Sequence, residues 1–413
     1  MGGEQARSKA EQVARRSYGK LVAFLAARTR DVAGAEDALS EAFAAALTDW
    51  PLQGCPDNPE AWLLTVARRK LIDVARHRSR ADAVAGQLEI LIGELDADEH
   101  PVIQDKRLAL LFACAHPALD VSIRSPLMLQ VVLGLDAKAI ASAFLTSPVA
   151  MGKRLVRAKN KIRQAGIPFV IPENEELASR LDAVLDAIYA GFAEGWSDAS
   201  GTDIARRDLV EEAIFLARLV VEMLPGEPEA LGLLALMLHA EARHRARRSS
   251  AGEYVPLAAQ DHSQWDLQMI AEAESLLRHA ATCGRIGRYQ LEGALQSAHM
   301  HRRRTSEANW KVVVQLYDAL SMLSSSPVVA VNRLLAVAEI DGANAVLAEI
   351  LRLGTDTRLS GYQPYWAARA EVLAKTGAHA EARHAYGIAI GLERDPAVRR
   401  FLQQRQAALP KGQ

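Results

Sequence analysis

Residues 148–164 hold the pattern that most constrains how this chain can fold. Met151, Leu155, Ala158 and Ile162 follow one another at intervals of four, three and four residues, which places them on one face of an α-helix. The other faces carry basic side chains with no acid among them, namely Lys153, Arg154, Arg157, Lys159, Lys161 and Arg163. The pattern predicts an amphipathic helix with a buried apolar stripe and a strongly basic exposed surface.

A shorter helix is predicted just before it, within residues 134–145. Asp136 can cap its N-terminus, and Ile140 and Phe144 give it a buried stripe. A break follows at residues 146–148, where Pro148 suits the first turn of the next helix. A basic helix behind a sharp turn is the layout of a helix-turn-helix DNA reader. The alternative is an ordinary helix with a solvated charged face.

The composition favours an all-α fold. Half of the 413 residues are hydrophobic and only 5% are aromatic, with Ala, Leu and Val prominent. This length allows two or three domains. Residues 1–170 hold 23 Lys and Arg against 19 Asp and Glu, a net charge of +4, whereas the remainder holds 26 against 31, a net charge of −5. The two halves are therefore expected to have different partners.

The front of the chain predicts further helices. Residues 1–12 are polar and expected to fray, and helical periodicity begins near Val13. A helix over residues 35–47 would bury Leu39 and its neighbours 42, 43 and 46. Its opposite side carries Asp37, Ser40 and Glu41, an acidic face. The alternative interpretation is a solvated face whose early acids suit the helix dipole.

A loop is predicted over residues 50–59, which contain three prolines and a glycine. Asn58 and Pro59 would then cap and start a helix. That helix is expected to bury an apolar stripe of Leu63, Val66, Ala67, Leu71 and Val74. Its other side carries a second basic set, Arg68, Arg69, Lys70, Arg76, Arg78 and Arg80, with Asp73 among them. Two basic helices in a nearly neutral chain favour nucleic-acid binding.

Residues 81–105 hold seven acids and no Lys or Arg, which predicts an acidic linker with a short helix at 88–91. Residues 106–133 return to a helical pattern, with His116 at a helix end before Pro117.

These stretches resemble a known family. SYGKLVAFLAARTRDVAGAEDALSEAF and WPLQGCPDNPEAWLLTVARRKLIDVARHR are similar to domain two of extracytoplasmic-function (ECF) sigma factors of RNA polymerase, and residues 107–163 are similar to domain four. The resemblance implies an all-α protein with sigma domain two at 10–80, a linker at 81–105 and sigma domain four at 106–171. It also implies a tetratricopeptide-like helical-hairpin solenoid at 172–413, typical of one subgroup.

The resemblance also implies roles for individual residues. Asp37, Ser40 and Glu41 would dock on the clamp helices of the largest subunit of core RNA polymerase, whose flap is a further contact. The minus-ten element of promoter DNA would be contacted by Trp50, Gln53, Asn58, Arg68, Arg69, Asp73 and Arg76. The minus-thirty-five element would be contacted by Ser147, Val149, Gly152, Lys153, Arg154, Arg157 and Lys161.

The rear half predicts helical hairpins. Leu177, Leu181, Val184, Leu185, Ile188 and Phe192 form one stripe. Around Trp366 and Tyr386 the spacing of apolar residues matches the tetratricopeptide pattern, and residues 327–353 predict a helical pair around Asp341 and Gly342. Stacked hairpins would offer a concave face for a protein or peptide partner.

No motif indicates an enzyme, a metal or another cofactor, because GxSxG, HExxH, GxxxxGK[ST] and GxGxxG are all missing. Three widely spaced cysteines, no signal-like run and no stretch long enough to span a bilayer predict a cytoplasmic protein without a membrane partner. Two alternatives stay open beside the sigma factor: a one-component helix-turn-helix regulator that binds DNA without polymerase, and a repeat-based scaffold. The acidic face at 36–47 favours the sigma factor over the regulator, which needs no polymerase dock.

Overall fold

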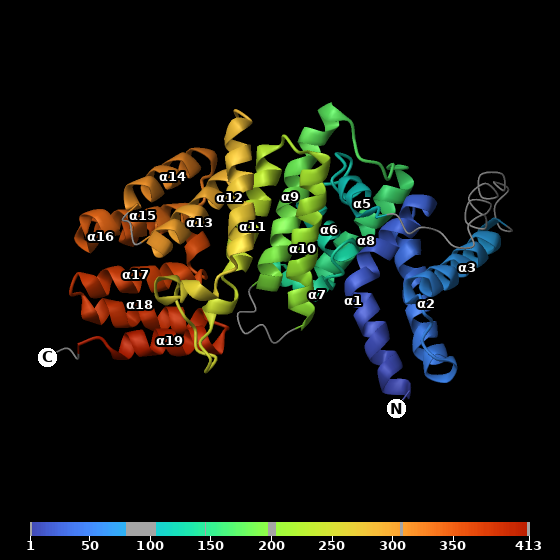
Figure 1. The fold of residues 1–413 in the computed structure, drawn as a ribbon, viewed down its shortest axis with the longest axis horizontal. Coiled ribbons are helices and arrows are strands. Elements are labelled where there is room, and N and C mark those ends of the chain that lie inside the picture. Colours follow the sequence, from blue (N-terminus) through green and yellow to red (C-terminus); the bar gives the residue numbers. More distant parts are fainter. Residues whose placement is uncertain (1, 80–104, 145, 197–203, 306–308, 411–413) are drawn as a thin grey trace. The chain divides into compact units, whose positions relative to one another are not determined.

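The computed structural model describes residues 2–79, 105–144, 146–196, 204–305 and 309–410. Within these ranges the regular structure is helical, with no strand and an isolated bridge between Arg248 and Tyr254 (Figure 1). The prediction of an all-α fold is therefore confirmed. The chain divides into two compact units, Met1–Asp198 with Asp203–Val220, and Ala199–Thr202 with Val221–Gln413.

The first unit begins with three mutually packed helices, α1 (Gly2–Thr29), α2 (Val32–Gln53) and α3 (Pro59–Ser79). Asp31 caps α2 by accepting a hydrogen bond from the Gly34 amide at 3.1 Å. Asn58 caps α3 in the same way, with its Oδ1 3.1 Å from the Ala61 nitrogen, and the predicted cap and first-turn proline are confirmed. Four leucines that are fully buried, Leu21, Leu25, Leu39 and Leu63, belong to these helices.

Two boundaries predicted from the sequence are wrong. The first helix begins at Gly2 rather than near residue 13, because Ala6 and Ala10 continue its buried stripe. The second helix continues to Gln53, so the loop is only residues 54–58. Trp50 is buried and its ring meets that of Trp62 edge-on, with centroids 5.6 Å apart. This packing keeps residues 50–53 helical although Pro51 cannot donate a backbone hydrogen bond.

Four further helices follow in the first unit, α5 (Arg107–Cys114), α6 (Val121–Val131), α7 (Ala137–Ala143) and α8 (Pro148–Gln164). His116 lies beyond the end of α5, as predicted, and its Nδ1 accepts from the Ala118 amide at 3.1 Å. The predicted stripe of α8 is confirmed, since its four apolar residues are all buried. Phe144 and Val74 were both expected in the core but are exposed.

Helix α9 (Asn174–Trp196) packs against α6, and a Cβ on Gly191 would lie 2.3 Å from a side-chain carbon of Leu133. The predicted stripe of α9 is buried from Leu181 to Phe192, with Leu177 half-buried. Helix α10 (Ile204–Met223) belongs to the first unit up to Val220. The predicted domain boundary at residue 172 stays a prediction. The predicted linker and its short helix at 88–91 lie outside the described residues, except for Asp105.

The second unit is a series of helical pairs, with a longer irregular segment between α11 and α12. Its α-helices are α11 (Pro228–Ala242), α12 (Leu267–Thr282), α13 (Arg288–Thr305), α14 (Trp310–Leu323), α15 (Pro327–Asp341), α16 (Ala343–Leu353), α17 (Gln363–Lys375), α18 (His379–Leu392) and α19 (Pro396–Ala407). Short 3-10 helices are η1 (Arg245–Arg247), η2 (Leu257–Ala259), η3 (His262–Gln264) and η4 (Thr357–Leu359). The predicted helical pair around Asp341 and Gly342 is confirmed as α15 and α16.

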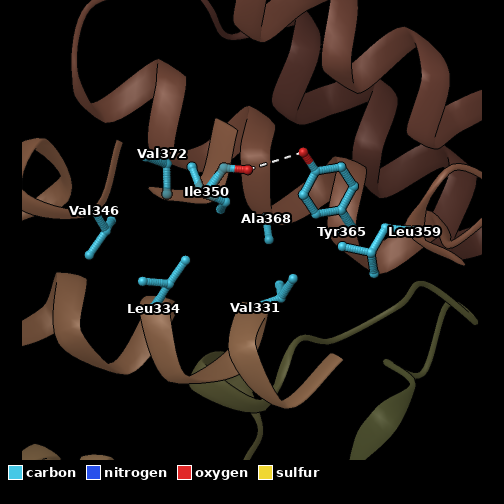
Figure 2. Close-up of a cluster of buried hydrophobic side chains, with 8 residues drawn as sticks. All are labelled: Val331, Leu334, Val346, Ile350, Leu359, Tyr365, Ala368 and Val372. Carbon is cyan, nitrogen blue, oxygen red and sulfur yellow. Dashed lines mark hydrogen bonds between the residues drawn. The ribbon is translucent and has the colours of Figure 1, made fainter. Parts of the chain in front are cut away.

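One core cluster of the second unit shows how consecutive pairs are joined. Val331 and Leu334 of α15 meet Val346 and Ile350 of α16 and side chains of α17 (Figure 2). The Tyr365 hydroxyl of α17 donates to the Ile350 carbonyl at 3.1 Å, which satisfies a buried polar group at the C-terminal end of α16 (Figure 2). No helix of the described residues is long and apolar enough to cross a membrane.

Candidate nucleic-acid interface

Helices α7 and α8 form two packed helices joined by a short connection. Local capping fixes where each begins. The Asp136 carboxylate accepts from the Ala139 amide at 2.7 Å, and the Ser147 hydroxyl accepts from the Ala150 amide at 3.2 Å. Pro148 occupies the first turn of α8. The four buried apolar residues of α8 then fix its rotation about its own axis, so that a defined set of side chains faces solvent.

One exposed row on α8 carries most of the residues predicted to contact the minus-thirty-five element. Val149, Lys153, Arg157 and Lys161 are spaced four apart and all are exposed. Ser147, the cap residue, is also exposed. Gly152 lies beside the row, and a Cβ added there would meet nothing within 4 Å. This part of the predicted set is therefore gathered on one face of one helix.

Arg154 lies beside this row and is held by hydrogen bonds within the protein. Its Nη2 donates to the carbonyl of Ser122 at 3.1 Å and to the hydroxyl of Ser122 at 2.6 Å. Ser122 is in the first turn of α6, whose cap is Asp120. A hollow of about 680 Å³ opens here, lined by these three residues and by Arg157 and Lys161. Hydrogen bonds from Ser122 lower the pKa of Asp120, so that its negative charge balances part of the basic lining.

The opposite flank of α8 contacts α2 rather than solvent. Lys159 Nζ lies 2.6 Å from Glu36 Oε2, and both side chains are only 12% exposed. Arg163 Nη1 lies 3.3 Å from Asp31 Oδ2, the cap residue of α2. Burial raises the pKa of Glu36, and the nearby Lys159 ammonium opposes that rise. Lys159 and Arg163 of α8 therefore form ion pairs within the protein.

The acidic face predicted for polymerase docking is exposed on α2. Asp37, Ser40 and Glu41 all face solvent within about one helical turn, while Glu36 faces α8. Glu41 pairs with Lys70 of α3 at 2.7 Å, and both side chains are about half-exposed. An exposed ion pair of this kind is weak, so Glu41 remains accessible to a partner.

The residues predicted for the minus-ten element divide into two groups. Gln53, Asn58, Arg69 and Asp73 are exposed at the 54–58 loop and along α3. Trp50 and Arg68 are buried instead, which corrects the expectation that both face solvent. The Arg68 guanidinium packs over the Phe24 ring, 5.4 Å from its centroid. The side chain of Arg76 lies outside the described part of the chain.

Sequence reasoning missed the ion pairs that join distant segments of the first unit. Arg15 of α1 lies 3.3 Å from Asp208 of α10, and Arg107 of α5 pairs with Glu212 of α10. Asp208 and Glu212 are one helical turn apart, which by itself predicts only a solvated acidic face. The one available signal for these ion pairs was Arg107, which stands in an otherwise apolar helix. A buried arginine in such a helix needs a carboxylate partner.

No group of three or more His, Cys, Asp or Glu that could hold a metal occurs in the described ranges. In those ranges Cys55, Cys114 and Cys283 are free thiols, respectively exposed, buried and half-buried.

Comparison with known proteins finds a family match that includes α2 and α3. Residues 13–81, which include both helices, match the family model for sigma-70 region 2. This match supports a sigma-70 family factor. Residues 180–281 match a family of unknown function, DUF6596. No solved structure matches.

The chain belongs to one family with the uncharacterized protein R00370 of Rhizobium meliloti (strain 1021). The two are 40% identical over 366 residues, which cover 87% of this chain and 86% of that protein. Region 2 implies binding to core RNA polymerase and to promoter DNA, and the sigma factor family is not a family of enzymes.

Proposed function

We propose that this sigma-70 factor is of the ECF type and reads promoters with two separate parts. The exposed face of Asp37, Ser40 and Glu41 docks on the clamp helices of the largest polymerase subunit. The 54–58 loop and the exposed side of α3 contact the minus-ten element, through Gln53, Asn58, Arg69 and Asp73. The segment 106–171, through α8, reads the minus-thirty-five element and contacts the polymerase flap.

The observation that carries this proposal is the exposed row of α8. A valine and three basic residues stand at four-residue intervals on a helix whose rotation is fixed by a buried stripe. Basic side chains supply phosphate contacts that fix the register on DNA, and residues near the start of the helix reach base edges. In this proposal Lys153 and Arg157 enter the major groove, and Lys161 contacts a phosphate further along.

The rear helical pairs, including the segment that matches DUF6596, form a tetratricopeptide-like domain that modulates this activity and binds a protein or peptide partner. Support comes from the packing of α17 on α18, where Ala370, Leu373, Ala382 and Tyr386 share one core cluster. These are positions at which the tetratricopeptide pattern places small and aromatic residues.

The proposal is tested by permanganate footprinting of a promoter fragment bound by core polymerase with and without this protein. Thymines of the minus-ten strand should become reactive only when both are present, because the sigma factor opens that strand. A protein that binds the fragment alone, and never makes these thymines reactive with polymerase, would be a one-component regulator instead. Asp37→Arg with Glu41→Arg should abolish the reactivity, whereas Glu381→Arg on the rear helix α18 should not.

A further inference from the structure

The second unit contains a hollow of about 770 Å³ that is lined by the helices α12, α13 and α14. The lining residues of α12 run from Ile270 to Ala281, a stretch of about 16 Å at about 1.5 Å per residue. The hollow is therefore a groove that follows the helices. Pockets for small molecules commonly have volumes of about 300–1,000 Å³. This groove has the size that one small ligand fills.

The pairing of α12 with α13 determines which side chains share each end of the groove. The two helices are joined by residues 283–287 and therefore run antiparallel. The Ser297 hydroxyl of α13 donates to Glu274 Oε1 of α12 at 2.5 Å, so these two residues mark the middle. His301 and Arg304 line the groove one and two turns beyond Ser297. They form one end of the groove, named here the basic end.

The other end of the groove is lined mainly by apolar side chains. Helix α14 begins beside the middle of the groove, where Asn309 Nδ2 donates to the Ala298 carbonyl at 2.7 Å. Val312 follows and is 49% exposed although it is apolar. The far end is formed by Leu277, Ala281 and Leu316. The groove therefore changes along its length from basic to apolar, and part of its apolar wall is open to water.

The uncompensated charge of the groove is positive. Glu274 is the one acid among the described residues that line it. This carboxylate is satisfied from within the protein, because Ser297 donates to it and Nε2 of the buried His239 lies 3.5 Å from Oε1. Arg278 and Arg304 are both exposed, and neither forms an ion pair with another described residue. Cations without a counter-charge favour an anionic ligand over a cationic one.

We propose that this groove binds a small amphiphilic carboxylate, a molecule with an apolar body and one anionic end. The carboxylate pairs with Arg304 at the basic end, because the planar guanidinium matches the two carboxylate oxygens. The apolar body lies along Val312 toward the apolar end and covers the exposed side chain there. The site gives the second unit a small-molecule ligand, separate from the protein or peptide partner of the proposed function.

The test is isothermal titration calorimetry of the full-length protein with three probes at neutral pH, each below the concentration at which it forms micelles. The probes are decanoate, octanoate and decylammonium. Decanoate should bind at one site per chain. Octanoate lacks two CH₂ groups and should bind about tenfold more weakly, because each buried CH₂ contributes about fourfold in affinity. Decylammonium has an apolar body of the same kind with the opposite charge, and it should bind at least about fivefold more weakly than decanoate.

Two pairs of variants locate the site. Val312→Glu places a carboxylate in the apolar wall and should weaken decanoate binding at least about tenfold. Its matched control is Met322→Glu, the same charge on an 86% exposed residue of α14 that does not line the groove. Arg304→Gln should weaken decanoate about fivefold without weakening decylammonium. Its control is Lys311→Gln, which removes an exposed cation of α14 outside the groove.

Several results would overturn the proposal. Failure of the parent to bind decanoate, or many weak sites without saturation, would show that the groove is no ligand site. Equal affinity of the parent and Val312→Glu would place the binding elsewhere, and decylammonium binding as tightly as decanoate would reject the anionic class. Thermal unfolding confirms that each variant is folded. The titration needs neither polymerase nor promoter, so these results leave the proposed function untouched.

Discussion

Arg154 and Lys161 offer the sharpest test of how α8 meets DNA, because they lie two turns apart on one helix. Arg154 is in the second turn, where side chains reach base edges, whereas Lys161 is near the C-terminal end. Arg154→Ala should weaken use of a promoter with its cognate minus-thirty-five element by about 1–3 kcal/mol, the value of a good base contact, which is roughly a five- to 150-fold loss. Use of a scrambled element should change little.

Lys161→Ala should act on both promoters alike, because a phosphate contact carries no sequence information. It should also reduce the slope of log affinity against log salt by about 0.9, which is roughly a threefold smaller loss of affinity between 50 and 200 mM salt. Arg154→Ala should also lower the stability of the fold, apart from its effect on DNA. The two hydrogen bonds to Ser122 are also lost, and each is worth about 0.5–1.5 kcal/mol to the fold.

The assay is run-off transcription with core polymerase on matched and scrambled templates over a range of salt, with thermal unfolding of each variant beside it. Ser122→Ala is the control for the fold, because it removes the hydroxyl acceptor of Arg154 and leaves the guanidinium in place. It should transcribe close to the parent. If Arg154→Ala and Lys161→Ala lose equal amounts on both templates, the division of α8 into base-reading and phosphate-contacting ends is refuted.

Three further predictions follow from other parts of the chain. Asp37→Arg with Glu41→Arg should abolish co-purification with core polymerase while leaving the circular dichroism spectrum unchanged, and intact co-purification would contradict the docking face. Truncation after Ile171 should reduce run-off transcription, because it removes α9 from α6 and exposes apolar surface there; equal or higher output from a folded fragment would indicate that the rear segment only inhibits. Stability of the full chain's second unit should fall by about 2 kcal/mol between pH 7 and pH 5, because burial lowers the pKa of His239 to about 4 and the unfolded state then binds more protons. His239→Leu should remove most of that fall in denaturant unfolding followed at both pH values, and an unchanged fall would show that another group is responsible.

The features predicted correctly from the sequence are those that neighbouring residues determine. The stripe of α8 follows from the helical period, and the caps at Asp136 and Asn58 follow from side chains that bond to amides three residues on. The family resemblance added the expectation of a sigma factor, and the match of residues 13–81 to sigma-70 region 2 supports it. Site residues carried over from that resemblance, such as Lys153, stay predictions until a complex is tested.

The features that the sequence did not predict depend on contacts between distant segments. The extent of α2 was misjudged because the burial of Trp50 against Trp62 outweighs the local signal of Pro51. Arg68 was assigned to solvent because helical periodicity cannot foresee its position over Phe24. For the ion pairs of α10 with Arg15 and Arg107, Arg107 in an apolar helix was the one local signal, because the acids and their arginine partners lie more than 100 residues apart.

The central claim is that this protein directs RNA polymerase to promoters, and run-off transcription tests it most directly. Purified core polymerase is incubated with a pool of genomic fragments, with and without the full-length protein, and the transcripts are mapped. The account predicts discrete start sites that appear only when the protein is present and that share an element upstream at the distance α8 would read. Transcripts that are the same with and without the protein, although it binds core polymerase and DNA, would contradict the account.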